Sequence, residues 1–152
     1  MKRWERIAFN GLGLVVAASG FAYLWMNYAM TTDDPFALVN HPWEPAMLSA
    51  HVLTSPAFVL AFGVLLNAHI VKQLRAWRRE NRLSGLTSLG TFATMASTGY
   101  LLQITTTEAL LTALVIVHIA SSVIFTLAYV GHLIISLRLP HTRPGTIGRQ
   151  AA

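Results

Sequence analysis

Four long apolar stretches dominate the hydropathy pattern of the chain, and short polar segments separate them. They run over residues 7–30, 46–71, 86–104 and 109–137, and none of them contains Asp, Glu, Lys or Arg. Because a helix rises about 1.5 Å per residue, each stretch is long enough to cross about 30 Å of hydrocarbon. The pattern predicts an all-α membrane protein, a bundle of four transmembrane helices formed by residues 1–138.

The charged residues indicate how these four helices are oriented. All 11 Lys and Arg residues lie before the first stretch, between the second and third, or after the fourth. The segments between the first and second stretches and between the third and fourth carry acidic residues instead, namely Asp33, Asp34, Glu44 and Glu108. By the positive-inside rule, both termini are expected in the cytoplasm and the loops 31–45 and 105–108 outside. We expect residues 139–152 to form a mobile cytoplasmic tail.

The composition narrows the class of protein further. Only 11% of the residues are charged and 54% are hydrophobic, whereas soluble domains carry about 25% charged residues. An ordinary soluble domain is therefore excluded. The absence of cysteine excludes disulfides, thiolate metal sites and covalently attached c-type haem. The net charge of +5 is explained by topology, so nucleic acid is not an expected partner. No catalytic constellation and no internal repeat is evident along the chain.

Four of the six histidines fall inside the apolar stretches, where ionisable residues are rare and usually functional. His51 and His69 are 18 residues apart, which is five helical turns and places both on one face. His118 and His132 are 14 residues apart, about 40° short of four turns. Since the second and fourth helices run in the same direction, the sequence predicts two opposed pairs, His51 with His118 in the outer half and His69 with His132 in the inner half.

Two opposed imidazoles at each level, with no carboxylate or thiolate at membrane depth, suit the two axial positions of a haem. A closed zinc site would instead require four clustered ligands. Three alternatives remain open: four histidines that only support helix packing, a His-lined metal or proton transporter, and an anchor subunit without a cofactor. His41 and His141 lie outside the apolar stretches, and we expect both to be surface residues.

These features resemble the small four-helix, membrane-bound di-haem b-type cytochromes. The resemblance is carried by His-x13-His in the fourth stretch, by the paired histidines of the second, and by the segment 97–102, STGYLL, in the third. It implies iron ligation of two haem b groups by His51, His69, His118 and His132. It also implies electron exchange with quinone and with a periplasmic redox protein or other subunits of a respiratory complex, in the bacterial inner membrane. The cytochrome subunits of formate dehydrogenases take one ligand from their first helix, which has no histidine here, so the layout is more similar to quinol-oxidising cytochrome b.

Two further groups of residues are candidates for contacts with the haems. Glycines could leave space for a porphyrin between helices, and the candidates are Gly11, Gly13, Gly20, Gly90 and Gly99. Basic residues at the cytoplasmic ends could bind the propionates of the inner haem, and the candidates are Arg6, Lys72 and Arg75.

The two histidine spacings differ by about 6 Å in helical rise. Pro56 lies between His51 and His69, and a transmembrane proline can kink its helix. We therefore expect the second helix to be kinked or more steeply tilted than the fourth.

Overall fold

A computed structural model describes residues 3–66 and 82–138, where long helices are joined by loops and no strand is present. The helices are α1 (Arg3–Ala29), α2 (Glu44–Leu65), α4 (Arg82–Leu102) and α5 (Glu108–Arg138). The all-helical class is therefore confirmed, and each helix begins within about four residues of its prediction. The described part of α2 ends at Leu65, whereas the sequence predicts a helix to residue 71. The end of that prediction and the predicted tail 139–152 lie outside the described residues.

The chain divides into two compact units, residues 1–82 and 83–152. The described residues of each unit form one pair of helices, which we call the first hairpin (α1 and α2) and the second hairpin (α4 and α5). The two hairpins are described separately below.

Aromatic rings hold the helices of the first hairpin together. The ring of Phe9 in α1 stacks on Phe58 in α2 with centroids 5.2 Å apart, and it lies 6.3 Å from the ring of Phe62. All three side chains are buried. A Cβ atom at Gly13 would lie 3.1 Å from the ring of Phe58, so the glycine permits this close approach. The hairpin core is therefore an aromatic layer between α1 and α2.

The second hairpin has an aromatic layer of the same kind. Phe92 in α4 packs against Phe125 in α5 with ring centroids 5.5 Å apart, and Phe125 stacks on Tyr129 at 6.3 Å. Phe92 and Phe125 are buried. The connection between the helices is short, because α4 ends at Leu102 and α5 begins at Glu108.

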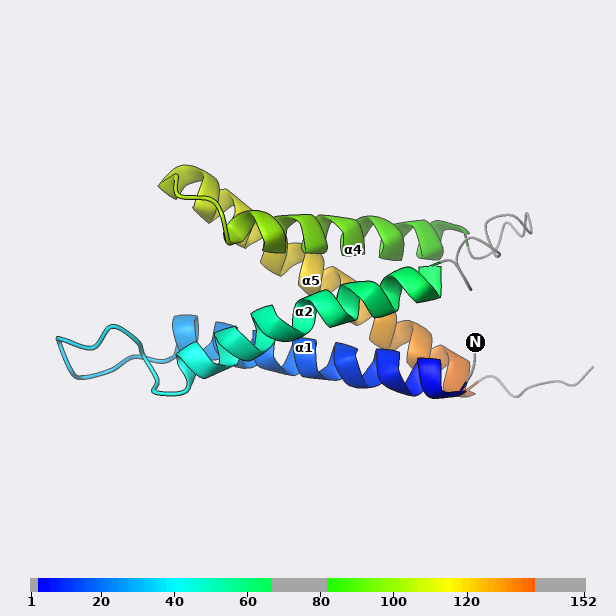
Figure 1. The fold of residues 1–152 in the computed structure, drawn as a ribbon, viewed down its shortest axis with the longest axis horizontal. Helices are drawn as coiled ribbons and strands as arrows, with labels where there is room; N and C mark the ends of the chain where they lie inside the picture. The colour runs from blue at the N-terminus through cyan, green and yellow to red at the C-terminus, as the bar shows by residue number, and fades with distance from the viewer. Residues whose placement is uncertain (1–2, 67–81, 139–152) are drawn as a thin grey trace, which may run out of the picture. The chain divides into compact units, whose positions relative to one another are not determined.

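The loop of the first hairpin is longer, and polar contacts fix its base. Figure 1 shows this loop projecting beyond the ends of α1 and α2. The Asn40 side-chain amide donates to the carbonyl of Asn27 at 2.9 Å, and its backbone N–H donates to the Glu44 carboxylate at 3.1 Å. Glu44 is buried in the first turn of α2, where a carboxylate also interacts favourably with the helix dipole. His41 lies in this loop, partly exposed as expected.

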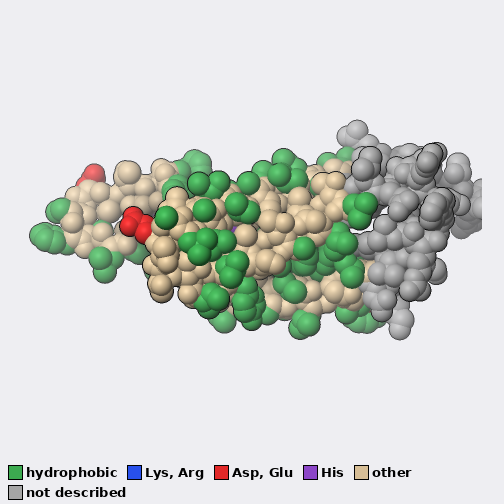
Figure 2. All heavy atoms as spheres, turned by 90° about the horizontal axis from the view of Figure 1, so that it is seen from above, with side chains coloured by type: hydrophobic (Ala, Val, Ile, Leu, Met, Phe, Trp, Pro, Cys, Tyr) green, Lys and Arg blue, Asp and Glu red, His purple; other side chains and the backbone are tan. Residues whose placement is uncertain are grey.

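Three of the described helices are long and apolar enough to cross a membrane: α1, α2 and residues 108–131 of α5. Large apolar side chains are exposed along them, and Figure 2 shows such side chains spread over the surface in view. Leu14, Leu53 and Leu127 are 71%, 77% and 67% exposed. Lipid is the solvent in which such a surface is stable. The helices are therefore those of a membrane protein.

Candidate histidine sites

His51 projects from α2 against α1, and its imidazole is fixed by the backbone there. The Nδ1 atom lies 2.9 Å from the carbonyl oxygen of Val16. One turn further along α1 is Gly20, where a Cβ atom would lie only 2.8 Å from both Cε1 and Nδ1 of the ring. Real Cβ atoms do not approach that closely, so the position of the ring requires glycine at residue 20.

His118 is held in the same way within the second hairpin. Its Nδ1 atom lies 3.0 Å from the carbonyl oxygen of Met95 in α4 and 3.1 Å from the hydroxyl oxygen of Thr98. A Cβ atom at Gly99 would lie 3.0 Å from the Cε1 atom of the ring. Both imidazoles are half-buried.

These contacts determine which ring nitrogen carries the proton. A carbonyl oxygen only accepts hydrogen bonds, so Nδ1 of His51 and of His118 must be the donor. In the neutral imidazole, the lone pair is then on Nε2, the nitrogen on the other side of the ring. Histidines that bind metals through Nε2 almost always have this arrangement, because the bond from Nδ1–H to a carbonyl orients the ring and increases its basicity. Both side chains therefore have the hydrogen bonding of a metal ligand.

The segments that receive the imidazoles are equivalent in the two hairpins. In residues 16–20, VAASG, and 95–99, MASTG, the histidine binds the carbonyl of the first residue and lies against the final glycine. The residue before each glycine carries a buried hydroxyl. Ser19 donates to the carbonyl of Val15 at 2.7 Å, and Thr98 donates to the carbonyl of Thr94, also at 2.7 Å.

The segments that supply the histidines are equivalent too. Residues 51–62 are HVLTSPAFVLAF and residues 118–129 are HIASSVIFTLAY. They share the histidine, a serine four residues later, a phenylalanine after seven residues and an aromatic ring after eleven. Ser55 and Ser122 donate to the carbonyls of their respective histidines at 2.6 and 2.7 Å. The shared phenylalanines are Phe58 and Phe125, the buried rings of the two aromatic layers.

The two hairpins are therefore copies of one structural unit, and the expectation that the chain has no internal repeat is wrong. The repeat is hard to find along the sequence because the hairpins differ in length. His51 follows Gly20 at a separation of 31 positions, whereas His118 follows Gly99 at a separation of 19. The signal that reveals it is the pair of segments H-x2-[TS]-S-x2-F-x-L-A-[FY], each preceded in the chain by A-[AS]-[ST]-G.

The glycines predicted to make room for porphyrin have distinct neighbours. Gly20 and Gly99 receive the imidazoles, and Gly13 receives the ring of Phe58. Gly11 and Gly90 occupy equivalent places in the repeat, nine residues before Gly20 and Gly99, and a Cβ atom at either would meet nothing within 4 Å. Three of these glycines thus permit a close contact with a ring within their own hairpin.

The remaining candidate residues are those that the sequence predicts for the inner haem. Arg6 is exposed near the start of α1. His132 lies in α5, and its side chain is not among those described. His69, Lys72 and Arg75 lie outside the described residues. The inner site therefore stays a prediction from the sequence.

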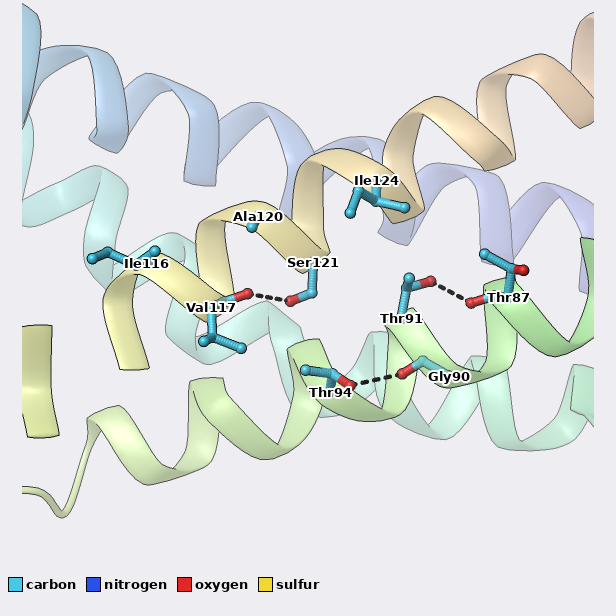
Figure 3. Close-up of a pocket in the computed structure, with 9 residues that line it drawn as sticks. All are labelled: Thr87, Gly90, Thr91, Thr94, Ile116, Val117, Ala120, Ser121 and Ile124. Atoms are coloured by element: carbon cyan, nitrogen blue, oxygen red, sulfur yellow. Dashed lines mark hydrogen bonds between the residues drawn. The ribbon is translucent and has the colours of Figure 1, made fainter. Parts of the chain in front are cut away.

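The second hairpin also has an open groove of about 490 Å³ between α4 and α5 (Figure 3). The hydroxyl groups of Thr91, Thr94 and Ser121 donate to carbonyls of their own helices. Thr91 donates to the carbonyl of Thr87 at 2.8 Å, and Thr94 donates to that of Gly90 at 2.9 Å. The rest of the lining is largely aliphatic, with Ile116, Val117, Ala120 and Ile124 from α5. Because the threonine protons are already used within α4, the groove mainly presents apolar surface.

Among the side chains that the structure describes, which do not include that of His132, no three of the His, Cys, Asp or Glu type gather as a metal-binding group. A haem takes only two axial ligands from the protein, so this finding concerns clustered metal sites. Comparison with family models, with curated proteins and with solved structures found no match to this chain.

Proposed function

We propose that the protein transfers electrons across the bacterial inner membrane through two bis-histidine b-type haems. His51 and His118 are the axial ligands of the outer haem, and His69 and His132 are those of the inner haem. Electrons pass between membrane quinone and a periplasmic redox protein or other subunits of a respiratory complex. The chain crosses the bilayer four times, with α4 as the third span, and both termini are cytoplasmic.

One observation carries this proposal: the chain repeats a helix hairpin, and each copy presents an imidazole whose Nδ1 donates to a carbonyl of the neighbouring helix. Helix packing alone does not require the same residue, the same carbonyl and the same glycine in both copies. Two equivalent imidazoles that coordinate through Nε2 match the two equivalent axial positions of a planar macrocycle.

The hydrogen bonding of His51 and His118 fits the coordination of haem iron. The bond to Val16 or Met95 holds each ring in one orientation and one tautomer, so coordination requires little reorganisation. Haem supplies one-electron Fe(III)/Fe(II) chemistry when it is bound. With four nitrogens from the porphyrin and two from histidines, the iron would have no coordination position left for oxygen, which favours electron transfer over oxidase activity.

Haem content of the purified protein tests the proposal directly. We expect a reduced-minus-oxidised spectrum with a b-type α-band and, in a pyridine haemochrome assay, two haems per chain. His51→Ala and His118→Ala should each reduce this value to about one, because each removes a ligand of the same haem. The matched control is His41→Ala, in the exposed loop, which should retain two. If the wild-type protein showed no α-band, electron transfer would be excluded, and a transporter or a cofactor-free anchor subunit would remain.

The orientation is tested by reporter fusions. Alkaline phosphatase is active only outside the cytoplasm, so we expect activity when it is inserted after Phe36 and none when it is fused at the C-terminus. A fluorescent protein that matures only in the cytoplasm should give the reverse result. Activity of the phosphatase at both positions would mean an odd number of spans, in which α4 does not cross the membrane, and activity at the C-terminus alone would mean the inverted orientation.

A further inference from the structure

The hydroxyl of Thr98 lies 3.1 Å from Nδ1 of His118, in addition to the Met95 carbonyl at 3.0 Å. Thr98 is 7% exposed, and its place beside Gly99 keeps the hydroxyl next to the imidazole. We propose that Thr98 is a positioning residue that acts on the metal-ligating properties of His118 by accepting a second hydrogen bond from its Nδ1–H. This inference deepens the proposed function and rests on it for its effect on the haem.

The direction of this hydrogen bond follows from the neighbouring acceptors. The Thr98 hydroxyl has one proton, and the carbonyl of Thr94 lies only 2.7 Å away. If that proton pointed at His118 instead, Nδ1 would have to be unprotonated, and its lone pair would face the Met95 carbonyl oxygen at 3.0 Å. That arrangement is repulsive. The hydroxyl therefore donates to Thr94, and its oxygen shares the Nδ1 proton of His118 with Met95.

Two acceptors on one N–H draw the proton further from the ring than one acceptor does. The imidazole becomes richer in electrons, and its Nε2 becomes a stronger donor to iron. A stronger donor stabilises Fe(III) more than Fe(II), so Thr98 lowers the reduction potential of the haem that His118 binds. The residue thus sets an electronic property of the site without touching the metal.

Three variants isolate the effect of the hydroxyl. Thr98→Val removes it and keeps the β-branched shape, and Thr98→Ser keeps it. Thr94→Val makes the same change one turn earlier in α4, where the hydroxyl is exposed and donates to Gly90. Thr94→Val is therefore the matched control for any general effect on the helix.

The first measurement is independent of haem. In protein labelled with 15N-histidine and not loaded with haem, His118→Gln identifies the His118 signals by their loss. We expect an Nδ1-protonated tautomer, and we expect its Nδ1 proton to move upfield in Thr98→Val as the hydrogen bonding weakens. Thr98→Ser and Thr94→Val should keep the wild-type shift. An unchanged shift in Thr98→Val would overturn the inference.

The second measurement is a redox titration of the haem-loaded protein. At fixed potential, Thr98→Val should raise the ratio of reduced to oxidised outer haem about threefold, the order expected for part of one hydrogen bond, while Thr98→Ser stays near the wild-type value. Equal potentials in Thr98→Val and Thr94→Val would refute the effect on the haem. If the protein bound no haem at all, the proposed function would fail, whereas the NMR result would still decide whether Thr98 positions His118.

Discussion

Gly20→Ala should empty the haem site that we propose for the outer half of the membrane. The new Cβ atom would lie 2.8 Å from Cε1 and Nδ1 of His51, so either the ring turns away or the two helices separate. Either movement breaks the hydrogen bond to Val16 that orients the imidazole. We expect the haem content to fall from two to about one per chain. Gly99→Ala should have a smaller effect, because its Cβ atom would lie 3.0 Å from one carbon of His118, and a shift of a few tenths of an ångström relieves the contact.

Two glycines outside the candidate sites supply matched controls for these substitutions. Gly63→Ala in α2 and Gly131→Ala in α5 make the same change at positions where a Cβ atom meets nothing within 4 Å. Both controls should keep two haems. Since alanine favours helix over glycine by about 1 kcal/mol, loss of haem in Gly20→Ala cannot be attributed to a weakened helix. Full haem content in Gly20→Ala would show that the His51 ring does not need its place against α1.

The course of the helices could be predicted from the sequence to within a few residues. The uncharged apolar stretches predict where each helix lies. In the hydrocarbon no water can bind the backbone N–H and C=O groups, so an apolar segment pairs them internally by forming a helix. His51 and His118 lie inside the second and fourth of these stretches, which places them in α2 and α5. These are local properties, determined by residues that are neighbours in the chain.

The partners of these histidines could not be predicted in the same way. Which carbonyl of α1 faces His51 depends on the register of two helices joined by a long loop, and Asn40 and Glu44 fix the base of that loop. The sequence names Gly20 as a candidate for porphyrin clearance, and within the hairpin this glycine also leaves the space that the His51 imidazole occupies. Register and side-chain direction are properties of packing, and a hydropathy pattern does not contain them.

The repeat distinguishes the two histidines proposed for the outer haem from the two proposed for the inner haem. His51 and His118 occupy the same position of the repeat, but His132 corresponds to Leu65 in the first hairpin, and His69 corresponds to Ser136 in the second. The inner histidines are thus displaced by four residues, about one helical turn. The difference in spacing noted in the sequence therefore arises after the repeated segment, in the inner half. A kink at Pro56 remains a prediction, and only the inner haem depends on it.

Phe58→Ala should destabilise the protein by about 2 kcal/mol, as should Phe125→Ala. Both rings are buried, Phe58 against Phe9 and Phe125 against Phe92. In a bilayer the unfolded helices are surrounded by lipid that is as apolar as the core, so no transfer from water adds to the cost. What remains is the lost packing and the cavity left behind, which places the effect below that of a soluble core.

The controls for these two substitutions are leucines at equivalent positions of the repeat, two residues after Phe58 and Phe125. Leu60 and Leu127 are 73% and 67% exposed, so in the bilayer lipid fills the space that their truncation leaves. Leu60→Ala and Leu127→Ala should stay within about 0.5 kcal/mol of the wild-type free energy of unfolding. The measurement is unfolding by SDS in mixed micelles, followed by circular dichroism. If all four variants lost the same free energy, the aromatic layers would not be the cores of the hairpins, and the register that brings each histidine to its carbonyl would need another cause.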